Sequence, residues 1–292
     1  MALSDRSQLI DGKRIAREIH AEVEVEVQKL LAAGRPPHLV AVEAARDPAS
    51  EVYVEKQRKR FSKLGIRYTH LNLEAQVTAA EMEARLDELN RDPTVTGILV
   101  TLPLPPGIPA NRIVDQIRPE KDVEGVTATH LGRLLGGRHR VGPCTALAVL
   151  AALESTGVLL KGKNAVVVGR SNIVGKPVGL LLLAERVTVT TCHTATRDLK
   201  DVTRRADILI AAAGKPHLVT KEMVREGTIV IDVGIHRVEG PRRTVGDVDF
   251  DSVAPLASWI TPVPGGIGPI TVAMLAKNTV RCAQDLAAPT PT

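Results

Sequence analysis

Apolar side chains recur at helical spacing in the first part of the chain. Over residues 12–33 they return every three or four positions, which predicts an amphipathic helix that Gly34 and Pro36 end. A short alternation over residues 23–27 is typical of a strand, but the length of the periodic segment and its flanks favour a helix.

Strands and helices then alternate along the chain. Thr78 and Glu81 form a capping box at the start of one helix. The predicted strands cover residues 38–44, 68–73 and 97–101, and the predicted helices cover residues 50–64 and 78–90. This alternation predicts βαβ units with a parallel sheet.

The pattern restarts after a connecting helix predicted over residues 144–155. Strands are predicted over residues 164–168, 187–192, 207–212 and 228–233, and helices over residues 177–184 and 271–286. We therefore predict an α/β protein of two domains. Residues 1–144 together with 271–292 form the first, and residues 145–270 form a Rossmann-like dinucleotide-binding domain with a parallel sheet.

The composition fits this fold. With 44% hydrophobic but only 2% aromatic residues, the core must consist of Val, Leu, Ile and Ala, which suits parallel strands covered by helices. The net charge is +5, and the densest basic stretch covers residues 56–60. We interpret this stretch as a solvated helix face rather than a nucleic-acid site, because no aromatic stacking platform accompanies it.

The cysteines and apolar runs restrict the setting of the protein. Cys144, Cys192 and Cys282 are odd in number and widely spaced, which argues against a disulfide framework and against a metal site. The longest apolar runs are too short to cross a bilayer, and the first ten residues lack the apolar core of a signal peptide. We expect a cytoplasmic protein with no metal, no nucleic-acid partner and no membrane partner.

A glycine loop, Gly169 to Gly175, follows a predicted strand and precedes a predicted helix. Glycine permits close backbone approach, and a helix N-terminus presents N–H groups to a phosphate. The spacing departs from the three-glycine fingerprint, so a plain tight turn is the alternative. The next strand ends in residues 192–197 without the acid that NAD-binding sheets place there. Arg170 and Arg197 are candidates for a 2′-phosphate, or else surface arginines, and we favour NADP over NAD.

Seven segments together match one family in order through almost the whole chain. They are Ser50–Val54, Gly97–Pro105, Pro119–Gly125, Pro143–Thr145, Gly169–Pro177, Asp232–Ile235 and Thr261–Leu275. The chain thereby resembles the bifunctional methylenetetrahydrofolate dehydrogenase/cyclohydrolases known as FolD. The glycine loop and the last segment are the specific ones.

The resemblance implies a folate-binding N-terminal domain and an NADP-binding domain with a cleft between them, in a homodimer. A hydride would pass from 5,10-methylenetetrahydrofolate to NADP, and water would then open the methenyl product to 10-formyltetrahydrofolate. The cofactor-binding residues that it implies are Gly169, Arg170, Ser171, Thr194 and Ile235. The substrate-binding residues are Tyr53, Gln57, Val100, Thr101, Leu102, Glu124, Pro264, Gly265, Gly266, Ile267 and Gly268, and the catalytic group is drawn from Tyr53, Gln57, Thr101 and Glu124.

The chain departs from the family pattern at three polar positions on the folate side. The family has a lysine four residues after the tyrosine, where this chain has Gln57 after Tyr53. The neighbouring Lys56 is rotated by about 100° around the helix and points elsewhere. A family glutamine is replaced by Thr101, and the second aspartate of Asp-Val-Asp-Gly is Glu124.

These replacements affect the two reactions differently. Hydride removal depends on positioning and needs no protein base, whereas ring opening needs proton transfer by a titratable group. The amide of Gln57 cannot titrate, and Tyr53, with an ordinary pKa of roughly 10, is a poor base at neutral pH. We therefore predict an NADP-dependent dehydrogenase whose cyclohydrolase activity is weak or absent.

Two alternatives remain open at this point. The concerted changes also suit a specialised FolD-like oxidoreductase that acts on a modified folate or another iminium-type substrate. A non-catalytic NADP-binding protein is the second alternative. The intact glycine loop and the segment of residues 261–275 argue against the latter.

Overall fold

A computed structural model describes residues 8–44, 48–74, 76–238 and 244–287, without the side chains of residues 48–53 and 56. The chain divides into two compact units. The described residues up to Glu18 and from Pro143 to Met274 form one unit, and those from Ile19 to Gly142 and from Leu275 onward form the other. Two of the three boundaries fall inside helices α1 (Gly12–Ala32) and α10 (Ile267–Ala287), and the third lies between Gly142 and Pro143.

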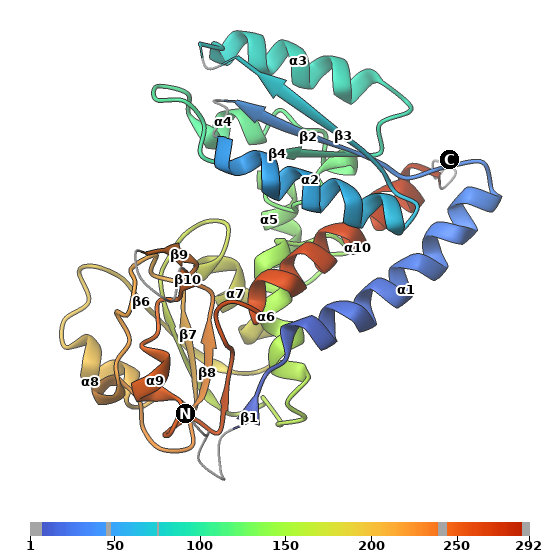
Figure 1. Cartoon of the computed structure of the whole chain (residues 1–292). Helices are drawn as coiled ribbons and strands as arrows, with labels where there is room; N and C mark the ends of the chain where they lie inside the picture. Colours follow the sequence, from blue (N-terminus) through green and yellow to red (C-terminus); the bar gives the residue numbers. More distant parts are fainter. Residues whose placement is uncertain (1–7, 45–47, 75, 239–243, 288–292) are drawn as a thin grey trace. The chain divides into compact units, whose positions relative to one another are not determined.

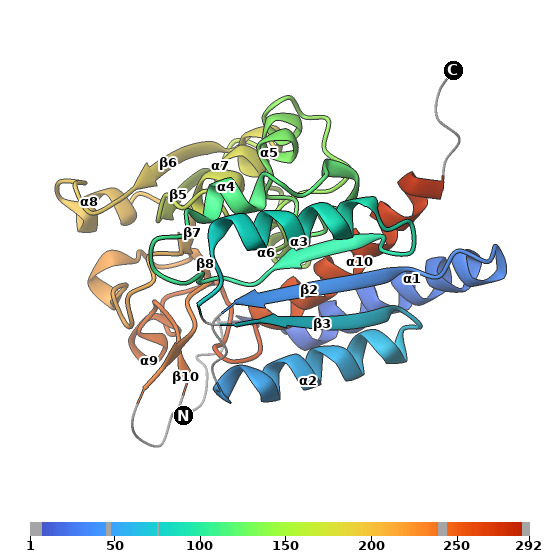
Figure 2. The same cartoon turned by 90° about the horizontal axis from the view of Figure 1, so that it is seen from above.

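The unit of residues 19–142 contains a three-stranded parallel sheet in the order β3-β2-β4. Its strands are β2 (His38–Ala44), β3 (Arg67–Leu73) and β4 (Gly97–Val100). Helices α2 (Pro48–Lys63) and α3 (Ala79–Arg91) cover opposite faces of this sheet (Figure 1). Shorter helices follow: α4 (Ala110–Val114), η1 (Pro119–Lys121) and α5 (Ala128–Leu135). The view from above shows the same layers (Figure 2).

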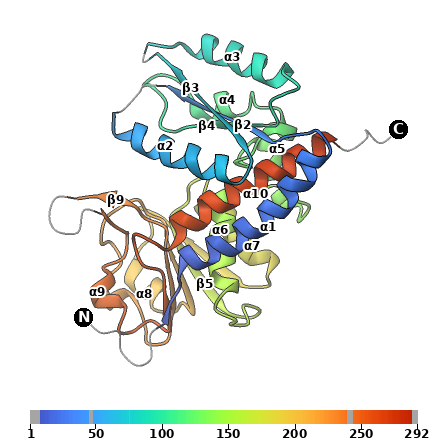
Figure 3. The same cartoon turned by 45° about the vertical axis from the view of Figure 1, so that its right-hand side comes forward.

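Each face of the three-stranded sheet has its own set of contacts. Met82 and Leu86 of α3 pack on Val40 and Val42, which point to one face. On the other face, the ring of Tyr68 packs against Phe61 of α2 at a centroid distance of 5.6 Å. The last part of α10 runs beside α1 (Figure 3), where the two helices are joined by an ion pair and a hydrogen bond. These are Lys277–Glu22 at 2.8 Å and Gln284–Glu26 at 2.7 Å.

The other unit contains a six-stranded sheet in the order β1-β11-β8-β7-β5-β6, in which neighbouring strands are parallel. Its strands are β1 (Gln8–Leu9), β5 (Asn164–Val168), β6 (Thr188–Cys192), β7 (Ile208–Ala211), β8 (Ile229–Asp232) and β11 (Trp259–Ile260). A two-stranded ribbon joins β9 (His236–Arg237) to β10 (Thr244–Val245). The helices are α6 (Cys144–Glu154), α7 (Gly175–Ala184), α8 (Leu199–Thr203), η2 (Lys221–Met223) and α9 (Phe250–Val253).

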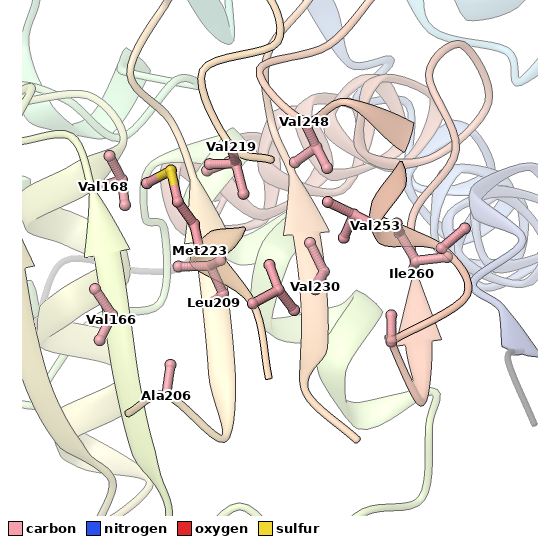
Figure 4. Close-up of a cluster of buried hydrophobic side chains, with 14 of the residues drawn as sticks. Val166, Val168, Ala206, Leu209, Val219, Met223, Val230, Val248, Val253 and Ile260 are labelled. Atoms are coloured by element: carbon pink, nitrogen blue, oxygen red, sulfur yellow. The ribbon is translucent and has the colours of Figure 1, made fainter. Parts of the chain in front are cut away.

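Strand order reverses between β5 and β7, because β6 lies on one side of β5 while β7, β8 and β11 extend on the other. In open parallel sheets, ligands bind outside the carboxyl ends of the strands at such a switch point. One face of the sheet is buried under an apolar cluster that includes Val166, Leu209, Val230 and Ile260 (Figure 4). This cluster fixes the strands whose ends carry the glycine loop.

Most of the predicted elements are present, with ends shifted by a few residues. The segment of residues 23–27 is helical, as its flanks indicated, and Thr78 forms the expected capping box with Glu81. One feature differs from the expected division of the chain. Strand β1 pairs with β11 through Gln8↔Trp259 and Leu9↔Ile260, so the N-terminal strand belongs to the unit of the six-stranded sheet.

Three findings on the described residues concern disulfides, metal ions and membrane-spanning helices. The three cysteines are buried and form no disulfide. Within the ranges that the structure covers, no group of His, Cys, Asp or Glu side chains is arranged to hold a metal ion. Among the same residues, no helix combines the length and apolar character needed to cross a membrane.

Candidate cofactor and substrate sites

The glycine loop lies directly after β5, at the switch point of the six-stranded sheet. Gly169 has a φ of +133°, and a methyl group there would overlap the carbonyl oxygen of Ala212, which follows β7. A methyl group at Gly175 would overlap the carbonyl oxygen of Gly169. The loop therefore folds tightly against itself and against the β7 end, and both positions require glycine. This geometry fits a dinucleotide, whose phosphates need close backbone approach.

Ser171 fixes the entry into helix α7. Its hydroxyl oxygen accepts hydrogen bonds from the N–H groups of Val174 at 3.1 Å and Gly175 at 3.3 Å. Lys176 in the first turn donates to Asn172 Oδ1 at 2.7 Å. A helix N-terminus with a nearby ammonium group stabilises negative charge, so this end of α7 is suited to a phosphate.

The turn after β6 holds Thr194 and Arg197, two of the residues expected near the cofactor. The N–H of His193 donates to Thr196 Oγ1 at 2.8 Å, and the N–H of Thr196 donates to the carbonyl of His193 at 2.9 Å. Thr194 lies exposed within this turn, and the side chains of Arg170 and Arg197 are also exposed. Residues 193–197 contain no carboxylate, so the positive charge of the arginines is not neutralised within the turn.

The remaining expected residues of this unit lie on two further loops. Ile235 follows β8 and exposes 63% of its surface. Residues 264–268 lead into α10, beginning with a cis bond between Val263 and Pro264. Gly265 has a φ of +110°, and a methyl group at Gly12 would overlap the carbonyl of Gly266. These loops are tightly packed backbone.

Gln57 lies in the other unit and is 7% exposed. Its side-chain oxygen accepts a hydrogen bond from the Tyr68 hydroxyl at 2.9 Å. This hydrogen bond joins the Gln57 side chain of α2 to the sheet face that α2 covers. The two residues are 11 positions apart in the sequence. Tyr53 lies one helical turn nearer the start of α2, and its side chain lies outside the described residues.

Thr101 and Glu124 both lie near the carboxyl end of β4. The N–H of Thr101 donates to the carbonyl of Val42 at 2.8 Å, continuing the pairing of β4 with β2. Asp122 forms a parallel bridge with Ile98 of β4. Glu124 is two residues further along the chain and therefore lies beside the end of β4. Val100 is buried, whereas the following Leu102 is 39% exposed, ahead of a cis Pro103.

A rigid turn presents Glu124. The carboxylate of Asp122 accepts the N–H groups of Gly125 at 2.8 Å and Thr127 at 2.9 Å. Gly125 has a φ of +71°, and a methyl group there would overlap the backbone of Gly142. Burial, with a smaller contribution from the charge of Asp122, raises the pKa of Glu124 to about 7. This carboxyl group therefore changes its charge near neutral pH.

A further polar pair lies on the sheet face that carries Tyr68. His70 Nε2 lies 2.9 Å from Glu43 Oε2, on adjacent strands β3 and β2. Tyr68 and His70 are two residues apart on β3, so their side chains point to the same face. The pair was not among the expected site residues. Its sequence signature is the acidic Glu43 within the mostly apolar strand of residues 38–44, which is unusual for a buried position.

The structure thus places the expected residues in two groups. Gln57, Thr101 and Glu124 lie in the unit of the three-stranded sheet, and the glycine loop, Thr194, Ile235 and residues 264–268 lie in the unit of the six-stranded sheet. A parallel sheet with a tight glycine loop at its switch point defines an α/β enzyme of the nicotinamide-dinucleotide class.

The family models make the assignment specific. The NAD(P)-binding domain of tetrahydrofolate dehydrogenase/cyclohydrolase matches residues 143–287, and the catalytic domain of the same family matches residues 10–124. The chain belongs to the tetrahydrofolate dehydrogenase/cyclohydrolase family, and its fold is the two-domain α/β fold of that family.

Individual relatives agree along nearly the whole chain. It is 51% identical to the bifunctional protein FolD of Moorella thermoacetica over 95% of this chain and 99% of that one. The structure of the bifunctional FolD enzyme of Campylobacter jejuni matches with a TM-score of 0.92 at 42% identity, covering 96% of this chain and 99% of that chain. The structure of the Trypanosoma brucei FolD, solved with NADP and an inhibitor, also matches with a TM-score of 0.92. Its sequence identity is 38%, and the match covers 98% of this chain and 100% of that chain.

Proposed function

We propose that the protein oxidises 5,10-methylenetetrahydrofolate to 5,10-methenyltetrahydrofolate with NADP in one-carbon metabolism, and that it hydrolyses the methenyl product only slowly. The family assignment supports the substrate and the dehydrogenase reaction. The observation that carries the proposal is the buried Gln57, whose amide oxygen accepts a hydrogen bond from Tyr68. A neutral, non-titrating group thus occupies the position at which the family places a lysine.

The residue roles follow the two groups described above. We propose that Gly169, Arg170, Ser171, Thr194 and Ile235 bind the cofactor, which supplies the hydride acceptor when bound. The residues proposed to bind and orient the folate are Tyr53, Gln57, Val100, Thr101, Leu102, Glu124 and residues 264–268. Positioning of this kind accounts for much of the rate of a hydride transfer, and no protein base is required for it.

NADP is proposed over NAD on charge. Arg170 and Arg197 are exposed near the end of β6, where no carboxylate within residues 193–197 would repel a 2′-phosphate. The Trypanosoma brucei relative was solved with NADP. We expect Arg170→Gln and Arg197→Gln each to raise the Kd for NADP by about 10-fold to 100-fold, since hydrogen bonds to charged groups contribute about 1.5–3 kcal/mol.

Calorimetric titration of each variant with NADP and with NAD tests this prediction. The Kd for NAD should stay within about twofold, because NAD lacks the phosphate that the arginines would bind. Lys200→Gln, which removes an exposed positive charge from α8, serves as the control. Equal weakening of NADP and NAD would contradict a role in 2′-phosphate recognition.

Slow hydrolysis is proposed because ring opening requires a proton acceptor and then a proton donor. The Gln57 amide is neither at any accessible pH, and its oxygen already accepts the Tyr68 hydroxyl. Separate assays test the two reactions: methylenetetrahydrofolate with NADP or NAD, and methenyltetrahydrofolate alone. Absence of folate-dependent NADP reduction would refute the dehydrogenase, and rapid enzyme-dependent hydrolysis would refute the slow second step.

Restoring the family lysine provides a direct mutational test. We expect Gln57→Lys to raise the hydrolysis rate by at least about 10-fold, because a positioned acid–base group contributes about 10²–10⁴-fold. Tyr68→Phe is its matched control, since it frees the Gln57 amide without adding a titratable group. A gain from Tyr68→Phe equal to that from Gln57→Lys would show that proton transfer at position 57 is not the missing element.

One observation favours a second candidate, an enzyme that keeps efficient cyclohydrolase activity through Glu124. A general base works best when its pKa is near the operating pH, and burial raises the pKa of Glu124 to about 7. In that case hydrolysis would be fast in the wild-type protein and would fall by about 10²-fold or more in Glu124→Gln. The dehydrogenase assignment is common to both candidates.

The resemblance to the family also leads us to propose a homodimer. Light scattering coupled to size-exclusion chromatography measures the mass directly against the 31.3 kDa of one chain.

A further inference from the structure

Two buried carboxylates, Asp232 and Asp247, lie beneath the loops that follow strands β7 and β8. Asp232 is 3% exposed and Asp247 is 0% exposed. A carboxylate is almost never so deeply buried unless several hydrogen bonds replace its hydration. The hydrogen-bond donors around these two carboxylates therefore show which parts of the chain the carboxylates hold in place.

Asp247 accepts four hydrogen bonds. The consecutive N–H groups of Ala213, Gly214 and Lys215 donate to its two carboxylate oxygens at 2.5, 2.9 and 3.0 Å. His236 Nε2 lies 2.7 Å from Oδ1 and donates the fourth. Three successive backbone N–H groups directed at one anion form a nest, the arrangement that proteins also use to bind phosphate. Here the anion inside the nest is a side chain of the protein itself.

Asp232 holds the neighbouring loop and Asp247 itself. Its Oδ1 accepts the N–H groups of Gly234 and Asp247, each at 2.9 Å, and its Oδ2 accepts the N–H of Val248 at 3.0 Å. A methyl group at Gly234 would overlap Asp247 Oδ1, and one at Gly246 would overlap Asp232 Oδ2. Glycine at these two positions allows the carboxylates to approach the backbone this closely.

The loop that Asp247 holds borders the candidate cofactor site. Residues 213–215 continue directly from Ala212, whose carbonyl packs against Gly169 of the glycine loop. The loop that Asp232 holds leads into the exposed Ile235, and His236 follows it on β9. One hydrogen-bonded group therefore fixes the ends of β7 and β8, next to the switch point where a dinucleotide binds.

We propose that His236 and Asp247 are positioning residues for the nicotinamide dinucleotide: together they hold loop 213–215 in the conformation that the cofactor requires. The inference rests on the proposed function, because it concerns the same cofactor. The side chain of His236 is 19% exposed and completes the hydrogen bonds of Asp247, and without it one oxygen of a fully buried carboxylate loses its side-chain donor.

The filled nest has a chemical consequence for recognition. The N–H groups of residues 213–215 are committed to Asp247 and do not bind a cofactor phosphate. The loop therefore contributes shape and carbonyl groups to the site, and phosphate binding falls to the glycine loop and the start of α7. Loss of His236 is expected to loosen the loop and weaken cofactor binding while leaving the folate-binding residues unaltered.

The test compares His236→Leu with His236→Gln and with Arg237→Leu in the full-length protein. Calorimetry with NADP and NAD should show a Kd raised by about 10-fold in His236→Leu, which corresponds to about 1.4 kcal/mol. His236→Gln keeps a side-chain N–H donor and should recover most of the affinity. Arg237→Leu changes the next residue of β9, whose side chain points to the opposite face, and should bind normally.

Two further measurements separate positioning from general destabilisation. Hydrogen exchange should show faster exchange at the amides of residues 213–215 in His236→Leu, with unchanged exchange in the central strand β5. The KM for the dinucleotide should rise, while the KM for the folate and kcat at saturating cofactor stay within about twofold. Asp247→Asn turns one acceptor into a donor that faces the N–H groups. If this variant folds, the amides of residues 213–215 should exchange faster in it than in His236→Leu.

The possible failures are distinguishable. An unchanged Kd in His236→Leu, with a lowered Tm, would overturn the positioning role and leave a structural one. Equal loss of affinity in His236→Gln and His236→Leu would also overturn it, because the donor would then not matter. Absence of NADP and NAD binding by the wild-type protein would instead refute the proposed function together with this inference.

Discussion

Gly175→Ala is expected to weaken dinucleotide binding by at least about 100-fold, which corresponds to about 2.7 kcal/mol. The added methyl group would overlap the carbonyl oxygen of Gly169, so the glycine loop must move away from the start of α7. The hydroxyl of Ser171 would then lose its hydrogen bonds to Val174 and Gly175. Calorimetric titration with NADP measures the loss, and far-ultraviolet circular dichroism checks that the variant is folded.

The same helix provides a matched control. A methyl group at Gly179 would meet its nearest neighbour, Val189 Cγ1, at 3.7 Å, which is ordinary van der Waals contact. Gly179→Ala should therefore bind NADP normally and should be more stable by about 0.5–1 kcal/mol, because alanine is the better helix former. If both variants bound equally well, the close approach of Gly175 to Gly169 would not matter for the cofactor.

Glu124→Gln is expected to stabilise the protein by about 1–3 kcal/mol at pH 8 and by nearly nothing at pH 4. In the folded protein, burial raises the pKa of Glu124 to about 7 from its ordinary 4.5. Below pH 4.5 the group is protonated in the folded and unfolded states alike. Between pH 4.5 and 7 only the folded state retains the proton, so the free energy of unfolding falls as pH rises. Above pH 7 the full penalty for a buried charge is present.

Urea denaturation at several pH values measures this effect. The difference between Glu124→Gln and wild type should grow from pH 4.5 to 7 and then level off. Glu24→Gln, which alters an exposed carboxyl group on α1, is the control and should show little dependence on pH. A constant difference across the pH range would mean that the turn held by Asp122 does not keep Glu124 away from water.

The sequence predicted those elements whose residues interact locally or repeat periodically. The capping box of Thr78 and Glu81 depends on residues three apart, and the strand of residues 164–168 is, after Asn164, a continuous apolar run before a glycine. Strands β1 and β11 were not predicted, because two residues are too few to show a period and their pairing joins distant segments. Helix α5 was also not predicted, although it begins at a threonine N-cap.

The candidate site follows the same division. The glycine loop was recognisable because its neighbours in sequence, a strand and a helix, are also its neighbours in space. The hydrogen bond of Gln57 to Tyr68 and the pair of His70 with Glu43 depend on how a helix and two strands pack, which no spacing reveals. The nest around Asp247 joins residues more than 30 positions apart, and no pattern in the sequence indicated it.

Strand β1 and the end of helix α10 also have a consequence for synthesis on the ribosome. The edge strand of the six-stranded sheet is made first, yet its partner β11 is residues 259–260. The unit of the three-stranded sheet likewise waits for its final helix, in which Asn278 donates to the carbonyls of Val123 and Gly142. Neither unit is complete in a nascent chain that lacks residues 259–287, so neither unit can finish folding before these residues have emerged. Until then the apolar face of helix α1 requires protection from aggregation, a role that chaperones serve for long-range topologies.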